Sequence, residues 1–184
     1  MSLNDRYLLR DIRPEEGPEA AAIEAICFPP HEACPRETML SRARDASDTF
    51  LVAEDRLTGQ LAGFLNGIAT DEEAFRDEFF TEPGLHLPGG ANLMLCGLDV
   101  LPEHRGQGLA RLLMETCRDR ERARGRRRLV LTCLDGKVDM YRRMGFRDLG
   151  LSASRWGGES WHEMELVLRE TPEAPARISP YILT

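Results

Sequence analysis

The order of apolar segments predicts an α+β fold in three layers, with a twisted, mostly antiparallel mixed sheet of about seven strands and helices on both faces. Two observations carry this prediction. Apolar runs of strand length alternate with stretches in which apolar residues recur every three or four positions. Turn sequences, Thr58-Gly59 and Trp156-Gly157-Gly158, separate consecutive strands. We expect one domain over residues 1–184, with a core at about 7–169 and a C-terminal tail at 170–184.

The expected elements follow in order along the chain. The N-terminal half should hold a strand at 7–13, helices that begin at Pro18 and Pro35, and strands at 49–54 and 60–68. The C-terminal half should hold a short helix or lid at 71–81, a strand at 93–101, a helix from Leu109, a strand at 129–133, a short helix at 138–143, and strands at 146–152 and 160–169. Proline suits the helix starts because the first turn does not use its missing N–H.

The charge pattern argues against a nucleic-acid-binding protein. The sequence carries 24 Lys and Arg against 31 Asp and Glu, for a net charge of −7, which disfavours nonspecific binding to a polyanion. A local exception is the basic run, which comprises Arg118, Arg120, Arg122, Arg124, Arg126, Arg127 and Arg128. We interpret the basic run as a solvated helix end, where cations suit the dipole. The alternative is a minor role in attracting an anionic cofactor.

The cysteines and the hydropathy pattern indicate a cytoplasmic protein. The five cysteines are an odd number and show no disulfide framework. No apolar run approaches the ~20 residues that a membrane helix needs, and residues 1–13 are too charged for a signal peptide. We expect no membrane partner, no nucleic-acid partner, and either a monomer or a homodimer.

A glycine-rich turn joins an apolar strand to a helix. The run 93–101, broken only by Gly97 and Asp99, leads through Pro102 to Arg105-Gly106-Gln107-Gly108-Leu109-Ala110. Glycines let backbone N–H groups approach a ligand, and the helix start adds unpaired donors and the positive end of a dipole, which favour phosphate. The turn lacks the Gly-Lys-Ser/Thr of a Walker A motif and the glycine spacing of a dinucleotide fingerprint.

Two motifs stand in a fixed order around this turn. They are Val100-Leu101-Pro102-x-x-Arg105-Gly106-x-Gly108-x-Ala110 and, about thirty residues later, Met140-Tyr141-Arg142-Arg143-Met144-Gly145-Phe146. The first resembles the acetyl-CoA-binding segment of the GCN5-related N-acetyltransferases (GNAT), and the second resembles that family's other hallmark. Within the family, Pro88-Gly89-Gly90, Asp135 and Glu163-Met164-Glu165-Leu166 look most like arylalkylamine N-acetyltransferase.

The resemblance implies the fold, the co-substrate and its binding residues. The strand ending near Val100 and the strand at 129–133 should run parallel and splay apart, which leaves a cleft for the pantetheine arm of acetyl-CoA. The residues implied in binding acetyl-CoA are Leu98, Asp99, Val100, Arg105, Gly106, Gln107, Gly108, Leu109, Ala110 and Tyr141. The implied activity is direct acetyl transfer to an amine, either an arylalkylamine or another small primary amine.

Acetyl transfer from a thioester needs a donor for the carbonyl oxygen and a proton for the departing thiolate. A backbone N–H at a strand bulge can supply the donor for the carbonyl oxygen. The resemblance places the bulge at Gly97 and Leu98. The alternative is that Gly97 merely relieves packing. The phenol of Tyr141 can supply the second, because a phenol of pKa ~10 can protonate a thiolate whose thiol has pKa ~8.5. The alternative is a core tyrosine.

The amine must also lose a proton, and here the sequence departs from the family. The histidine pair credited to the vertebrate enzymes falls on Met94 and Cys96, which cannot relay a proton at neutral pH. The loop 28–35 resembles the acceptor-side loop of bacterial and insect relatives and puts Glu32 at the place of their base, with His31 as a substitute. The alternative is a solvent-exposed loop carboxylate.

Other candidate sites give weaker hypotheses. Cys27, His31 and Cys34 lack a zinc spacing, so we expect no metal. We expect surface or turn positions for His86, His104 and His162. The aromatics Phe28, Phe79, Phe80 and Trp156 either wall an acceptor pocket or belong to the core. The alternative to an enzyme is a catalytically silent acyl-CoA sensor, which would not need the phenol of Tyr141.

Overall fold

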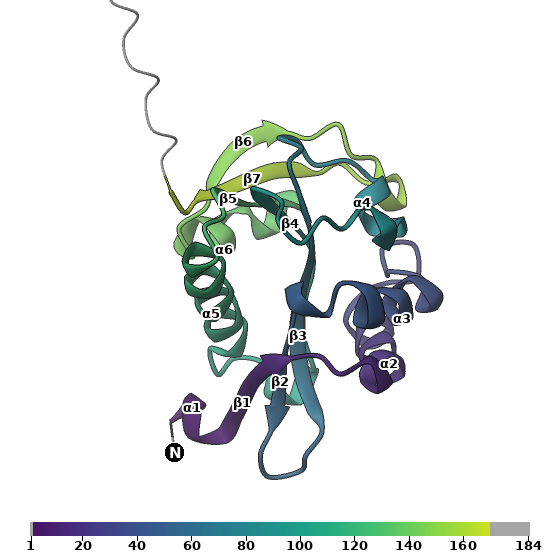
Figure 1. Cartoon of the computed structure of the whole chain (residues 1–184), viewed down its shortest axis with the longest axis vertical. Helices are drawn as coiled ribbons and strands as arrows, with labels where there is room; N and C mark the ends of the chain where they lie inside the picture. Colours follow the sequence, from purple (N-terminus) through teal and green to yellow (C-terminus); the bar gives the residue numbers. More distant parts are fainter. Residues whose placement is uncertain (1, 170–184) are drawn as a thin grey trace, which may run out of the picture.

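A seven-stranded sheet forms the centre of the molecule, in a computed structural model that describes residues 2–169 (Figure 1). The strand order is β1-β2-β3-β4-β5-β7-β6. The strands are β1 (Tyr7–Asp11), β2 (Phe50–Asp55), β3 (Leu61–Thr70), β4 (Asn92–Val100), β5 (Arg128–Cys133), β6 (Arg147–Leu151) and β7 (His162–Val167). Strands β4 and β5 run parallel, and the other neighbouring pairs among these strands are antiparallel.

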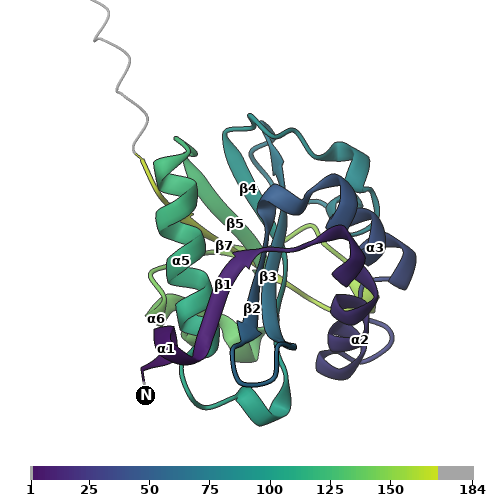
Figure 2. The ribbon, with the colours of Figure 1, turned by 60° about the horizontal axis from the view of Figure 1, so that its bottom comes forward.

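Helices cover both faces of the sheet (Figure 2). The helices are α1 (Leu3–Arg6), α2 (Gly17–Cys27), α3 (Arg36–Asp45), α4 (Glu78–Thr81), α5 (Leu109–Ala123) and α6 (Val138–Arg143). One face packs against α5 and α6, and the opposite face packs against α2, α3 and α4. The expected α+β architecture with three layers is confirmed.

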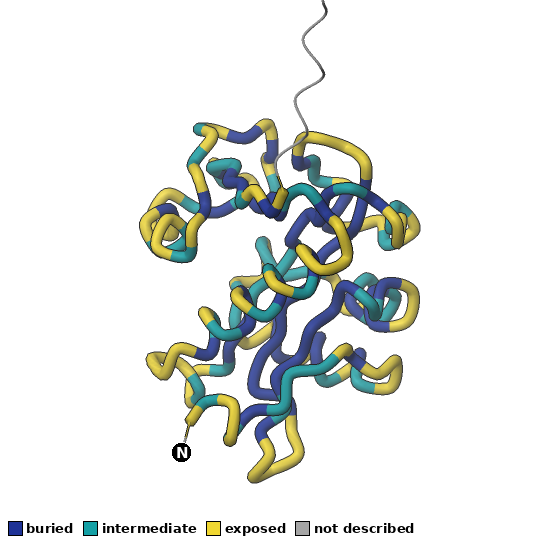
Figure 3. The backbone as a smooth tube through the Cα atoms, turned by 60° about the vertical axis from the view of Figure 1, so that its left-hand side comes forward, coloured by how far each residue is buried: buried dark blue, intermediate teal, exposed yellow. Residues whose placement is uncertain are grey.

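Strand β3 is the centre of the core, because all ten of its residues are buried. Figure 3 shows that buried backbone runs through the middle of the molecule. Alternate residues of a strand point to opposite faces. Leu65 therefore joins the cluster under α5, while Phe64 packs with Phe50 under α2 and α3. Helix α5 supplies the facing apolar stripe with Leu109, Leu113 and Cys117, all at most 2% exposed.

Two irregularities of β4 open the sheet. Asn66 pairs with Gly97 and Gly67 pairs with Leu95, so Cys96 is an extra residue that bulges from the β3–β4 ladder. On its other edge, β4 pairs with β5 only over residues 92–95 and then diverges. The expected splay of the parallel strands is confirmed, and the bulge adjoins the expected Gly97.

Several local expectations need correction. The strands expected at 7–13 and 160–169 are shorter, and the acidic segment 71–81 is helical only over α4. The tail expected at 170–184 lies outside the described residues. His86 takes the turn position of the two alternatives, at the end of the 3-10 turn 83–85; its side chain is 3% exposed, with Nε2 2.9 Å from Asp48 Oδ1 and Nδ1 accepting from Ala69 N–H. Among residues 2–169, no helix has the length and apolar character needed to cross a membrane.

The interpretation of the basic run as a solvated helix end is wrong at Arg126. This guanidinium is 4% exposed and pairs with the fully buried carboxylate of Glu121 on α5. It also donates to the carbonyl oxygens of Gly90 and Pro88. The neighbouring Arg127 and Arg128 pair with Glu73 at the surface. Much of the basic run is therefore neutralised within the protein.

Candidate active site

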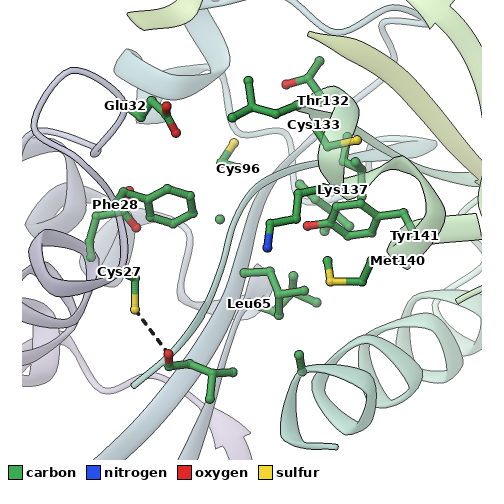
Figure 4. A pocket seen from close by; sticks show the side chains of 18 of the residues that line it. Cys27, Phe28, Glu32, Leu65, Cys96, Thr132, Cys133, Lys137, Met140 and Tyr141 are labelled. Atoms are coloured by element: carbon green, nitrogen blue, oxygen red, sulfur yellow. Dashed lines mark hydrogen bonds between the residues drawn. The ribbon is translucent and has the colours of Figure 1, made fainter. Parts of the chain in front are cut away.

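A cavity of about 570 Å³ occupies the gap between the splayed strands (Figure 4). Its walls come from β4 and β5, from α2 and the loop after it, from the starts of α5 and α6, and from the segment before β7. The cavity therefore passes between the two faces of the sheet, because α5 and α6 cover one face and α2 covers the other. A ligand that enters from one face can meet a ligand that enters from the other.

The turn between β4 and α5 is built to bind an anion. Gly106 and Gly108 have φ angles of +71° and +91°, which side chains rarely adopt. Among the described residues, the N–H groups of 106–108 donate to no acceptor in the protein. The first N–H groups of α5, a helix of 15 residues, add further free donors and the positive end of its dipole. The Nε of Arg105 donates to Val100 O at 2.8 Å and ties this turn to β4.

The residues expected to bind acetyl-CoA divide into three groups. Side chains of Leu98, Val100, Arg105, Ala110 and Tyr141 line the cavity. Gly106, Gln107, Gly108 and Leu109 form the adjacent turn and offer backbone N–H groups; the Gln107 side chain instead accepts from Arg6 at 3.0 Å. Asp99 is the exception, because its carboxyl group is 1% exposed and does not line the cavity. The backbone of Asp99 pairs with Phe64 of β3, so no part of Asp99 lines the cavity.

Tyr141 points its hydroxyl into the cavity from α6 (Figure 4). Its ring packs edge-on against Phe146, with the centroids 5.7 Å apart. Burial is the main cause that raises the pKa of the phenol above its ordinary value, and the nearby Cys133 and Asp99 add to the shift. A phenol with a raised pKa stays protonated at neutral pH and can donate a proton.

Glu32 lies on the wall opposite Tyr141 (Figure 4). Its side chain is 10% exposed, which excludes the alternative of a solvent-exposed loop carboxylate. The loop is anchored, because Glu32 N–H and Ala33 N–H both donate to Pro29 O, and Trp156 Nε1 donates to Glu32 O at 2.7 Å. His31 lies at the rim, with Nε2 3.4 Å from Glu32 Oε1 and 3.3 Å from Glu159 Oε1.

Aromatic side chains surround the half of the cavity that Glu32 faces. Phe28, Phe80, Trp156 and Trp161 line it, and the rings of Phe80 and Trp156 stack at a tilt of 31° with centroids 5.0 Å apart. Phe79 is fully buried and belongs to the core. An aromatic wall beside a carboxylate suits a cation with an apolar body.

Of the two residues at the family's histidine positions, Met94 belongs to the core, whereas Cys96 lines the cavity. Met94 is fully buried with Phe79 and Val130. Cys96 contacts Phe79 O through Sγ at 3.4 Å, and burial raises the pKa of its thiol. Cys27 and Cys34, which entered the metal hypothesis, contact different carbonyl oxygens, those of Val100 and Phe80.

Sequence reasoning missed a buried polar group beside the cavity. Glu24 of α2 and Asp99 of β4 lie side by side next to Gly97, and Arg42 and Asn66 lie close by; all four are at most 3% exposed. The sequence could have indicated that Glu24 is buried, because this residue stands one helical turn after Ala20 on the buried face of α2. Lys137 also lines the cavity, but no motif or pattern in the sequence pointed to it.

A sheet opened between two parallel strands, with free N–H groups in a turn at one end of the opening, suits an extended ligand that carries phosphate. The model of the acetyltransferase (GNAT) family matches residues 12–146, and the chain belongs to this family.

Solved structures of other proteins share this fold. The loading GNATL domain of CurA from Lyngbya majuscula has a TM-score of 0.76 at 16% identity, with 88% of this chain and 98% of that chain covered. The GphF GNAT-like decarboxylase in complex with isobutyryl-CoA has a TM-score of 0.71 at 22% identity, with 88% and 100% covered. YncA from Salmonella typhimurium, solved with its cofactor acetyl-CoA, has a TM-score of 0.62 at 18% identity, with 92% and 98% covered.

Proposed function

We propose that the protein is an N-acetyltransferase that moves the acetyl group of acetyl-CoA directly to a small primary amine, with an arylalkylamine as the leading acceptor class. One observation carries the proposal: the hydroxyl of Tyr141 and the carboxylate of Glu32 face the same cavity from opposite walls, where β4 and β5 part. A proton donor on one side and a proton acceptor on the other match the two ends of an acyl transfer.

The residues of the cleft fit acetyl-CoA. The free N–H groups of the turn and the guanidinium of Arg105 suit a pyrophosphate. The unpaired edge of β4 at Leu98 and Val100 suits the amides of a pantetheine arm. When bound, acetyl-CoA supplies the thioester carbon, and the N–H groups at the bulge of β4 are the donors for its oxygen.

The chain's own residues manage the protons. Glu32 draws a cationic amine into the cavity and accepts the proton that frees its lone pair. The nitrogen forms its bond to the acyl carbon as the carbon–sulfur bond breaks. Tyr141 gives its proton to the departing sulfur. No nucleophile of the protein forms a covalent intermediate.

The acceptor class follows from the cavity wall. Phe28, Phe80 and Trp156 offer aromatic faces, and Glu32 offers negative charge beside them. An amine on a short chain that ends in an aromatic ring fits both features. The competing hypothesis is an acyl-CoA sensor without chemistry, which would have no use for a buried phenol aimed into the cavity.

The test is release of free thiol from acyl-CoA in the presence of candidate acceptors. Aryl amines, polyamines, amino acids and peptide N-termini should be offered with acetyl-CoA and, separately, with isobutyryl-CoA. We expect the highest kcat/KM for acetyl-CoA with an arylalkylamine, and mass spectrometry should find the acetyl group on nitrogen. Tight binding of acetyl-CoA without turnover for any amine would favour the sensor.

A further inference from the structure

Glu24 and Asp99 form a buried carboxyl pair at the edge of the cavity. They are 3% and 1% exposed, and Asp99 Oδ1 and Glu24 Oε2 converge on the same point beside Gly97. Glu24 Oε1 accepts from Cys34 N–H at 2.8 Å. Within the described chain, Glu24 Oε2 and both Asp99 oxygens have no donor from any other residue. Two ionised carboxylates that are buried side by side without donors repel one another strongly, so this arrangement favours a proton shared between them.

The surroundings of the pair favour one proton and one negative charge. Burial raises the pKa of both carboxyl groups, and that of Asp99 rises further through the charge of Glu24. The buried guanidinium of Arg42 favours the remaining negative charge, although its own hydrogen bonds go to Asn66 Oδ1 and to Phe79 O and Phe80 O. The titratable and charged groups that face the pair are Cys27, Cys34, Arg42, Cys96, Arg105 and Tyr141.

The pair lies next to the cavity, beside the bulge of β4. A Cβ built on Gly97 would lie 3.2 Å from Asp99 Oδ1, 3.4 Å from Asn66 Nδ2 and 3.6 Å from Glu24 Oε2. Because Gly97 has no side chain, nothing of residue 97 covers these atoms. Glu24 itself lines the cavity. The Nδ2 of Asn66, 1% exposed, also lacks an acceptor within the described residues. A buried donor and a buried acceptor without partners indicate a site that a ligand or water completes.

We propose that Glu24 and Asp99 form a proton-sharing pair that accepts the second proton lost by the acceptor amine, with Glu24 receiving it and Asp99 positioning Glu24. The inference rests on the proposed function and extends its proton path. The pair lies on the face of the sheet that α2 covers, opposite the glycine turn and α5. An acceptor nitrogen at the bulge would therefore have Glu24 beside it.

The proton balance requires such a group. A primary ammonium carries three protons, and the amide product keeps one. Glu32 passes the first proton to solvent before the nitrogen attacks. Glu24 takes the second once the carbon–nitrogen bond has formed, while Tyr141 protonates the sulfur. The proton held on Glu24 then returns to Tyr141 through water, and the net products are the amide, the free thiol and one proton in solution.

Three variants separate this role from a structural one. Glu24→Gln keeps the shape and removes the acceptor, so kcat should fall by ~10²-fold or more while the affinity for acetyl-CoA stays unchanged. Asp99→Asn replaces a protonated carboxyl by an amide that can also donate to Glu24, so activity should stay within about threefold of wild type. Glu165→Gln, at a buried carboxylate of β7 outside the cavity, is the control and should leave turnover per folded molecule unchanged.

Infrared spectroscopy reads the shared proton without any substrate. The wild-type protein at pH 7 should show the C=O band of a protonated carboxyl group. The band should vanish in Asp99→Asn and persist in Glu165→Gln. On acidification, wild type should gain a second such band as Glu24 takes up a proton.

Each outcome decides the proposal. Wild-type turnover in Glu24→Gln, or an equal loss in Asp99→Asn and Glu24→Gln, would overturn it, as would a missing band at pH 7 in an active enzyme. That last result would leave the acetyltransferase activity standing. A band in a protein that acetylates no amine would instead overturn the proposed function and this catalytic role together. Should Glu24→Gln fail to unfold cooperatively, the Asp99→Asn rate and the two bands of wild type decide the question.

Discussion

Arg126 and Glu121 form an ion pair that is buried from solvent, with exposed fractions of 4% and 0% for their side chains. Glu121 also receives a hydrogen bond from Arg124 at 2.8 Å. The guanidinium of Arg126 reaches the carbonyl oxygens of Pro88 and Gly90. This pair therefore fastens the end of α5 to the loop that precedes β4, and it holds the two elements that frame the glycine turn.

Arg126→Met should destabilise the protein strongly. The change leaves the buried carboxylate of Glu121 and the carbonyl oxygens of Gly90 and Pro88 without this donor, which should cost about 3 kcal/mol of the free energy of unfolding. Arg127→Met is the control, because Arg127 pairs at the surface with the exposed Glu73 and should contribute less than about 1 kcal/mol. Urea unfolding of both variants measures the difference. Equal midpoints would mean that the buried pair does not anchor α5.

Gly108→Val should weaken acetyl-CoA binding by ~10-fold or more, or ~1.4 kcal/mol. A side chain at a φ of +91° strains the start of α5 and obstructs the approach of a phosphate to the free N–H groups. Gly59→Val is the matched control, because Gly59 has a φ of +73° in a hairpin turn far from the cavity. Calorimetry with acetyl-CoA should show a loss in the first variant alone. The same affinity in both variants would reject the turn as the phosphate site.

Glu32→Gln should lower kcat/KM at pH 7 and recover part of the loss toward pH 10. A primary ammonium with pKa near ~10 is ~0.1% free amine at neutral pH, so a site without its base depends on that small fraction. The fraction grows as the pH rises, which explains the recovery. Rates from pH 6 to 10 with a fixed acceptor test this. Superimposable profiles of wild type and variant would remove Glu32 from the mechanism.

The basic run should not bind nucleic acid. Arg124 and Arg126 pair with Glu121, Arg127 pairs with Glu73, and Arg128 pairs with Glu73 and Glu165. Few of these charges are free to release counterions from a phosphate backbone. Fluorescence anisotropy with a random duplex and a random single strand at physiological salt should find no submicromolar binding. A steep salt dependence of tight binding would contradict this expectation.

Local sequence patterns predicted most of the helices and strands of the fold. The run at 93–101 predicted β4, the apolar period from Leu109 predicted α5, and the glycines between them predicted the turn. The relationships that sequence did not reveal join distant residues. Glu24 and Asp99 meet only because α2 packs across the bulge of β4.

The aromatic contacts on the acceptor side of the cavity are likewise relationships that the sequence did not reveal. The stacking of Phe80 on Trp156 depends on how the segment around α4 and the turn before β7 come together over the sheet. No spacing in the chain encodes that contact. Likewise, the burial of Arg126 depends on the carbonyl oxygens of a loop that lies 36 residues earlier. A basic run by itself indicates a solvated surface.

The turnover of Tyr141→Phe tests the account most directly. The change removes one hydroxyl and keeps the ring that packs against Phe146. With acetyl-CoA and the best amine of the acceptor panel, we predict that kcat falls by ~10²-fold or more while the dissociation constant for acetyl-CoA stays the same. Burial raises the pKa of Tyr141, so the phenol should stay protonated as the pH passes 10.0. The wild-type rate should therefore not fall at that pH through loss of this acid. Equal kcat values for the two proteins would contradict the account, since Tyr141 would then be a core residue.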